Sequence, residues 1–126
     1  MSGVEAYDAA LDPLRKRSDV LEKRFARVQR PGRAGPDRVR DVLEEIVVEY
    51  ADLLEESRAI EVEGGRLRRA HVALLASLEA QQEGLELALQ GVETGDAALL
   101  AEAAALMSRA QEQLDEHRRL LARAGR

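Results

Sequence analysis

The fold of this chain is decided by residues 37–92, which read DRVRDVLEEIVVEYADLLEESRAIEVEGGRLRRAHVALLASLEAQQEGLELALQGV. Apolar residues return along this stretch at alternating intervals of four and three positions, with few interruptions. The positions of this seam are Val39, Leu43, Ile46, Tyr50, Leu53, Ser57, Ile60, Gly64, Leu67, His71, Leu74, Leu78, Gln81, Leu85, Ala88 and Val92. A spacing that averages about 3.5 residues keeps one seam on one side of an α-helix, as in helices that wind around one another. The rest of the chain is expected to cover that seam.

The apolar face of this stretch is wider than the seam itself. Val42, Val47, Leu54 and Leu75 stand beside the seam, so that about three positions in seven are apolar. A two-stranded coiled coil carries charges at such flanking positions, whereas a four-helix bundle buries them. The pattern therefore predicts an all-α, antiparallel fold resembling a four-helix bundle. The 126 residues are enough for one such domain, residues 1–126.

The main ambiguity is whether residues 37–92 form one helix or two. Gly64 and Gly65 lie in the middle, and each costs about 1 kcal/mol relative to Ala in a helix interior. A break there gives four helices, roughly 3–30, 37–63, 66–92 and 96–124, which close into an up-down-up-down bundle within one chain. Without a break the stretch is a helix of about 84 Å, and such a three-helix chain needs a second copy, giving a homodimer. Because the seam keeps its phase through Gly64, we expect the continuous or kinked helix, with Gly64 and Gly65 as its hinge.

The segments on either side of this stretch are expected to fold back on it. Residues 3–30 repeat the four-and-three spacing, with a kink or a fresh start at Pro13. Two prolines and two glycines in residues 30–36 predict a loop, and residues 94–96 predict a tight turn before the last helix. The facing pairs expected from antiparallel folding are Ser18 with Tyr50, Leu85 with Ala103, and His71 with His117.

The charges of the chain, which sum to −5, are unevenly placed. Residues 15–40 hold ten basic and three acidic side chains, whereas residues 41–63 hold nine acidic side chains and Arg58. Clustered Arg and Lys can bind phosphates, but only Phe25 among the basic residues offers a ring for stacking on bases. Folding back at residues 30–36 lays the two segments side by side. We therefore expect them to pair with each other, and we expect no nucleic-acid partner.

Composition indicates where the protein works. The chain has no cysteine, which fits a reducing compartment. Residues 1–14 carry three acidic side chains and no basic one, unlike a signal peptide. The most apolar window, residues 97–107, is interrupted by Glu102 and falls short of the roughly 20 residues that a membrane helix needs. These features predict a soluble, cytoplasmic protein without a membrane partner.

His71 and His117 are the two histidines of the chain, and the expected hairpin brings them to the same level. A metal site is one interpretation, with a dimer supplying four imidazoles. However, no carboxylate lies one turn away from either histidine, and zinc sites need three or four ligands. A polar layer that fixes the helix register, loosened when the imidazoles become protonated, is the interpretation that we favour. We expect no bound metal and no cofactor.

The sequence offers no catalytic residues. Most acidic side chains of residues 41–63 fall on positions that face water or the basic segment, whereas general acid-base catalysis needs a carboxylate in a pocket. Gly64 and Gly65 lack the strand before them and the Lys-Ser/Thr ending of a phosphate-binding loop. We therefore expect no enzymatic activity.

The last helix has more apolar surface than one neighbour can bury. We define the last-helix stripe as the five residues expected to bind a partner, which are Leu99, Leu100, Ala103, Leu106 and Met107. The leading hypothesis is a structural or adaptor module that self-associates as a homodimer and binds a helix of another protein. An alternative is a small acidic chaperone that shields an amphipathic segment of a secreted or assembling protein. A second alternative is a metal-binding bundle using His71 and His117.

Overall fold

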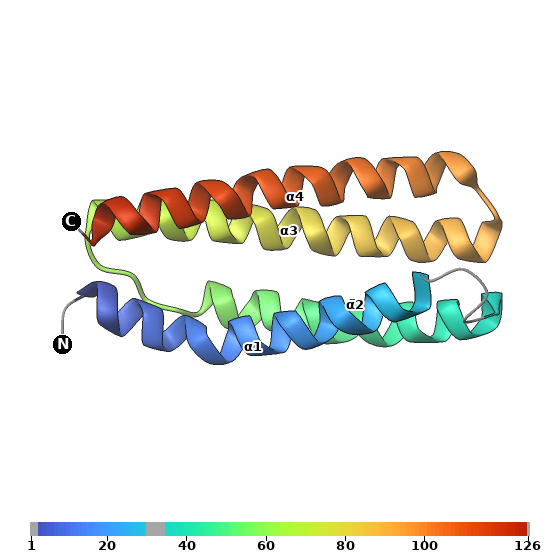
Figure 1. The fold of residues 1–126 in the computed structure, drawn as a ribbon, viewed down its shortest axis with the longest axis horizontal. Coiled ribbons are helices and arrows are strands. Elements are labelled where there is room, and N and C mark those ends of the chain that lie inside the picture. Colours follow the sequence, from blue (N-terminus) through green and yellow to red (C-terminus); the bar gives the residue numbers. More distant parts are fainter. Residues whose placement is uncertain (1–2, 30–34, 126) are drawn as a thin grey trace.

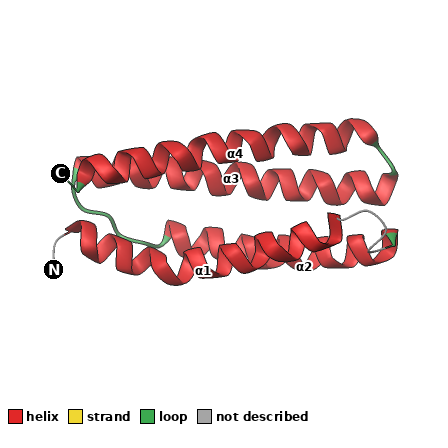
Figure 2. Cartoon of the chain, in the orientation of Figure 1, coloured by secondary structure: helices red, strands yellow, loops and turns green. Residues whose placement is uncertain are grey.

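A computed structural model of the chain describes residues 3–29 and 35–125, and these residues form four α-helices and no strand. The helices are α1 (Gly3–Gln29), α2 (Pro36–Arg58), α3 (Gly65–Thr94) and α4 (Ala97–Ala124). Figure 2 shows how little of the described chain lies outside them. The predicted all-α fold is confirmed. Of the loop predicted for residues 30–36, residues 30–34 lie outside the described part, and Pro36 already begins α2.

The four helices run alternately up and down along one long axis (Figure 1). α1 and α2 form one hairpin, α3 and α4 form a second, and the start of α1 lies at the same end as the end of α4 (Figure 1). The closest packing is between α3 and α4, followed by α2 with α3 and α1 with α2. The main chains of α1 and α4, by contrast, come close at few positions, although Leu121 and Ala124 of α4 pack on the cluster of Tyr7, Leu11 and Leu67. The bundle is therefore packed most closely within the second hairpin and more loosely between α1 and α4.

The prediction of one continuous helix over residues 37–92 is wrong. α2 ends at Arg58, and residues 59–64 connect it to α3 without helical structure. Gly64, one of the two predicted hinge residues, has φ 93°, whereas Gly65 is already the first residue of α3. Residues 59–64 are not helical, but Ile60 and Val62 pack on the cluster of Tyr7, Leu11 and Leu67. Ile60 is therefore apolar because it is part of the core, and its place in the four-and-three pattern did not indicate a helix.

This break also removes the argument for a dimer of three-helix chains. One chain supplies four helices, so the seam of the central stretch is covered from within. The largest fully buried side chains include Leu43, Ile46, Leu53 and Leu85, which are all seam residues of α2 and α3. The homodimer predicted from the sequence therefore loses the argument on which it was based.

The first hairpin shows the predicted pairing of opposite charges. Arg17 of α1 pairs with Glu56 of α2, and Arg24 pairs with Glu45 and with Glu49, the last at 3.0 Å. These pairs are partly exposed, and such pairs contribute about 0–1 kcal/mol each. These ion pairs therefore contribute little to the stability of the α1–α2 hairpin. α1 runs through Pro13 as one helix, so the fresh start that we allowed there is absent.

Within the described residues, no helix is both long and apolar enough to cross a membrane.

Candidate functional site

Small residues bring the backbones of α3 and α4 close together. We call them the small-residue seam: Ala70, Ser77, Gly84 and Gly91 on α3, spaced by seven, and Ala103 and Ala110 on α4. The Ser77 hydroxyl donates to the Ala110 carbonyl at 2.7 Å, and the Asp96 N–H donates to the Gly91 carbonyl at 3.1 Å. A Cβ added to Gly84 would lie 3.3 Å from the Ala103 carbonyl oxygen. Only residues with little or no side chain fit at this separation.

The seam sets a register one residue away from the predicted one. His117 faces Ala70 rather than His71, and Ala103 faces Gly84 rather than Leu85. The shift follows from packing, because the closest approach selects the smallest residues. The seven-residue spacing of small residues in α3 was a signal in the sequence that could have indicated this seam.

The last-helix stripe, which lies on α4, does not form one surface. Ala103 is 4% exposed and lies beneath α3, so it is unavailable to a partner in this fold. Leu106 and Met107 flank it, since both lie within 3.4 Å of a Cβ added to Gly84. By helical spacing Leu99 belongs to the side of Leu106, and Leu100 to the side of Met107. Leu100, at 42% exposed, is the most accessible large apolar side chain of α4.

The two histidines are buried in the core, and the ring of Tyr7 lies near both of them. The ring of Tyr7 lies 5.5 Å from the ring of His71 and 6.3 Å from that of His117, measured between centroids. The Tyr7 hydroxyl and Nδ1 of His71 share a hydrogen bond of 2.9 Å. Nδ1 of His117 donates to the Ala70 carbonyl at 2.7 Å. The histidines therefore join both hairpins through α1, α3 and α4.

Burial lowers the pKa of both histidines. For His117 the hydrogen bond to the Ala70 carbonyl opposes this shift, whereas the charges of Arg15, His71 and Arg118 add to it. The main chain of Ser57 opposes the shift of His71, but Nε2 of His71 has no hydrogen bond of regular geometry. Among the residues that the structure describes, no three histidine, aspartate, glutamate or cysteine side chains gather as metal ligands would. The metal-binding alternative therefore gains no support from the geometry.

A cleft of about 390 Å³ lies along the α1–α4 edge at the middle of the bundle. All four helices contribute to it, and six leucines give it an apolar floor and walls: Leu11, Leu14, Leu53, Leu74, Leu78 and Leu114. Its polar lining consists of Arg15, Ser18, Asp19, Glu22, Tyr50, Ser57, Ser77, Gln81, Gln111, His117 and Arg118. The volume is within the range of sites for small molecules. No residue of the cleft except His117 was singled out by sequence as a site.

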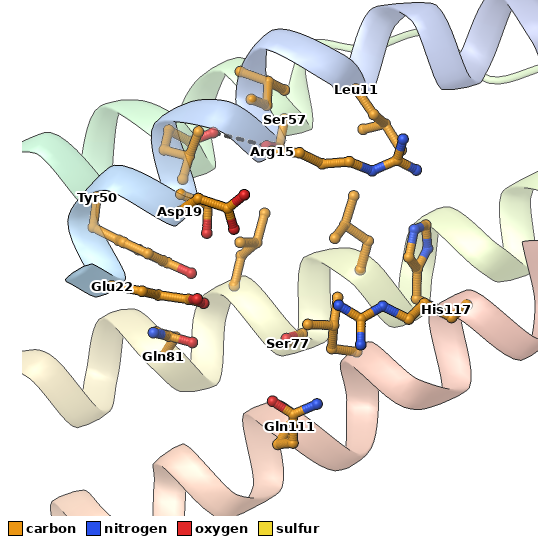
Figure 3. Close-up of a pocket in the computed structure, with 17 residues that line it drawn as sticks. Leu11, Arg15, Asp19, Glu22, Tyr50, Ser57, Ser77, Gln81, Gln111 and His117 are labelled. Carbon is orange, nitrogen blue, oxygen red and sulfur yellow. Dashed lines mark hydrogen bonds between the residues drawn. The ribbon is translucent and has the colours of Figure 1, made fainter. Parts of the chain in front are cut away.

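The charges of the cleft are separated along its length. Figure 3 shows Glu22, Tyr50 and Gln81 directed toward one another at one end, with Arg15 and His117 toward the other. Arg15 already donates to Asp8 at 2.6 Å. Glu22 forms no ion pair within the described structure. Its pKa is raised by burial and by the nearby charge of Asp19, and is lowered in part by Arg118.

Tyr50 is the buried polar group at the acidic end of the cleft. It is 2% exposed, and burial raises its pKa, which a hydrogen bond with Ser18 opposes. The predicted proximity of Ser18 and Tyr50 is confirmed, since both line the cleft. The phenol therefore stays neutral at physiological pH and can give or accept a hydrogen bond.

We compared the chain with protein families, with curated proteins and with solved structures, and none of the three comparisons found a match.

Proposed function

We propose that this protein is a non-enzymatic helical interaction module, an adaptor that binds an amphipathic helix of another protein along its α1–α4 edge. The observation that carries the proposal is the loose packing along this edge. Few main-chain positions of α1 and α4 come close, and the half-buried Leu14, Leu74 and Leu114 line a cleft between them. A closed bundle would cover these side chains with its own helices.

An apolar line on α4 extends this edge beyond the cleft. Leu100, Met107, Leu114 and Leu121 follow one another at intervals of seven, and Leu114 lines the cleft. Leu100 is exposed and the other three are half-buried. A partner helix with apolar residues three and four positions apart fits such a line. Met107 adds adaptability, because its unbranched side chain repacks easily.

The polar groups of the cleft support a binding role over a catalytic one. The hydroxyls of Ser57 and Ser77 donate to main-chain carbonyls, at 2.8 and 2.7 Å. His117 uses Nδ1 on the Ala70 carbonyl. These serines and this histidine therefore do not form the hydrogen-bonded nucleophile and base that covalent catalysis needs.

Partner capture from a cell lysate, with identification of the retained proteins, tests the proposal. The double variant Leu100→Glu with Met107→Glu is expected to lose the partner, because charges replace the apolar line. Val72→Glu is the matched control, since Val72 is 66% exposed on α3 and belongs to neither the line nor the cleft. Circular dichroism must show the same helix content in all variants. Equal capture by the double variant and by the wild type would refute this surface, and retention of unfolded clients alone would favour the chaperone alternative.

A further inference from the structure

The acidic end of the cleft is equipped for a positively charged group. Two carboxylates of α1, Asp19 and Glu22, stand one turn apart, the Tyr50 hydroxyl comes from α2, and the Gln81 amide comes from α3. Figure 3 shows the side chains of Glu22, Tyr50 and Gln81 directed toward the same space. Polar side chains from three separate helices therefore face one another at this end of the cleft, where Tyr50 also has a hydrogen bond with Ser18.

The two ends of the cleft differ in how far their charges are already neutralised. Arg15 donates to Asp8 at 2.6 Å, and Arg118 has Asp115 at 3.7 Å. Asp19 and Glu22 are exposed, and neither makes an ion pair with any residue in the described part of the chain, although the charge of Arg118 lowers the pKa of Glu22 from a longer distance. These two carboxylates can therefore take a positively charged group.

The leucines of the cleft favour a ligand that also has a hydrocarbon part. Leu14, Leu53, Leu78 and Leu114, one from each helix, line the same cleft, where Leu53 and Leu78 are buried and Leu14 and Leu114 are half-buried. Water against the accessible surface of Leu14 and Leu114 is unfavourable at about 25 cal/mol for each Å² of apolar surface. A ligand gains from both parts of the cleft only if it joins a cation to a hydrocarbon chain.

We propose that the α1–α4 cleft binds an alkylammonium group, with the ammonium held by Glu22, Asp19, Tyr50 and Gln81 and the hydrocarbon chain lying on the leucines. Glu22 and Asp19 supply the countercharge, and the oxygens of Tyr50 and Gln81 accept two of the ammonium N–H bonds. The cleft volume of about 390 Å³ accommodates a chain the size of an octyl group with the ammonium attached.

This chemistry has two sources. One is a free amphiphilic amine, and the other is a lysine of the partner helix that the proposed function places on the same edge. If the ligand is a free amine, the site does not depend on the proposed function. If the ligand is a lysine of the partner helix, the site rests on the proposed function and specifies the partner. The test therefore begins with the isolated protein and a defined probe.

Titration with n-octylammonium, followed by NMR at constant ionic strength, is the direct experiment. We expect saturable one-to-one binding with shifts of the side-chain amide signals of Gln81 and Gln111. n-Octanoate has the same chain and the opposite charge, and it should bind at least about tenfold more weakly, given the strength of charge-assisted hydrogen bonds. Octanoate binding as tightly as octylammonium would show that Arg15 and Arg118 govern the cleft, and would overturn the proposal.

Variants separate a specific site from attraction to an acidic protein. Glu22→Gln keeps the shape of the side chain and should weaken octylammonium binding about tenfold. Glu102→Gln makes the same change at an exposed residue of α4 outside the cleft, and should have no effect. An equal loss in the two variants, or no binding by the wild type, would overturn the proposal.

The source of the ammonium is resolved by the captured partner. If octylammonium displaces that partner, and Glu22→Gln weakens capture, then a lysine of the partner occupies the site. If capture is unchanged while octylammonium still binds, the ligand is a free amine. Octylammonium binding is measured without any partner, so failure of the proposed function leaves this result intact.

Discussion

At the scale of single residues, the adjacent glycines Gly64 and Gly65 have different backbone conformations. Gly64 has φ 93° and ψ 141°, a region that is essentially restricted to glycine, whereas Gly65 begins α3 with helical geometry. A Cβ would meet no atom within 4 Å at either position. Any difference between alanine variants at these positions therefore reports backbone conformation alone.

Gly64→Ala is expected to lower the free energy of unfolding by about 1–3 kcal/mol, because the alanine must hold a positive φ. Gly65→Ala should change it by less than about 1 kcal/mol, and in the stabilising direction, because alanine restricts the unfolded chain. Urea denaturation of the two variants beside the wild type provides the measurement. Equal stabilities for the two variants would mean that residue 64 does not keep this conformation in solution.

The buried histidines make stability depend on pH. Burial lowers the pKa of His71 and of His117 below 6.5 in the folded state, so the unfolded state takes up protons first as the pH falls. The groups facing them are Tyr7, Ser57, Arg15 and Arg118, and none of these is a carboxylate that could stabilise an imidazolium. Their contribution to stability is complete above pH 6.5 and is lost as the pH falls from 6.5 toward the lowered pKa values.

Chemical denaturation between pH 7 and pH 5 should therefore show a decreasing free energy of unfolding. The slope is at most about 1.4 kcal/mol per pH unit for each histidine. His71→Gln should reduce that slope while keeping an amide that can bond to Tyr7. NMR titration of the imidazole signals is the independent check, and midpoints at or above 6.5 for both histidines would contradict the prediction.

At the scale of elements, the small residues between α3 and α4 allow these two helices to pack closely. The small-residue seam was not predicted, because its α3 residues stand one position before the apolar seam residues His71, Leu78, Leu85 and Val92. The hairpin itself was predicted from the turn at residues 94–96, and its register was wrong by one residue. The position of the turn determines roughly which residues of α3 and α4 lie near each other. The exact register depends on how closely the two backbones pack, which the sequence of either helix alone does not show.

Neighbouring alanines of α4 test this seam. Ala103 is buried against α3, and Ala104 is exposed. Ala103→Leu forces additional carbon atoms between touching backbones and should lower the free energy of unfolding by about 1–3 kcal/mol. Ala104→Leu has nearly the same helix propensity and should stay within about 0.5 kcal/mol of the wild type. If Ala103→Leu proves as stable as Ala104→Leu in thermal and urea denaturation, the close approach of α3 and α4 is not present in solution.

At the scale of the whole molecule, the sequence correctly predicted an all-α fold resembling a four-helix bundle but not the path between α2 and α3. The unbroken phase through Ile60 suggested helix, yet Ile60 and Val62 pack on the cluster of Tyr7, Leu11 and Leu67, of which Tyr7 and Leu11 lie about fifty residues away in the chain. Local periodicity cannot register such a contact. The cleft was beyond prediction for the same reason, since it depends on how far α1 stands from α4 after both hairpins have formed.

A four-helix bundle with a break at residues 59–64 is shorter than a chain with one continuous helix over residues 37–92. The longest helix, α3, has 30 residues and a length of about 45 Å, so the bundle is about half as long as the 84 Å rod of a continuous helix. Because one chain covers its own seam, we expect light scattering to give a monomer of 13.9 kDa and small-angle X-ray scattering to give the shorter particle. A dimer with the longer dimension would mean that residues 59–64 become helical in solution and that each chain completes its bundle with the hairpin of another. A dimer with the shorter dimension would instead place the contact on the surface of intact bundles, where the exposed side chain of Leu100 is the first residue to test by substitution with glutamate.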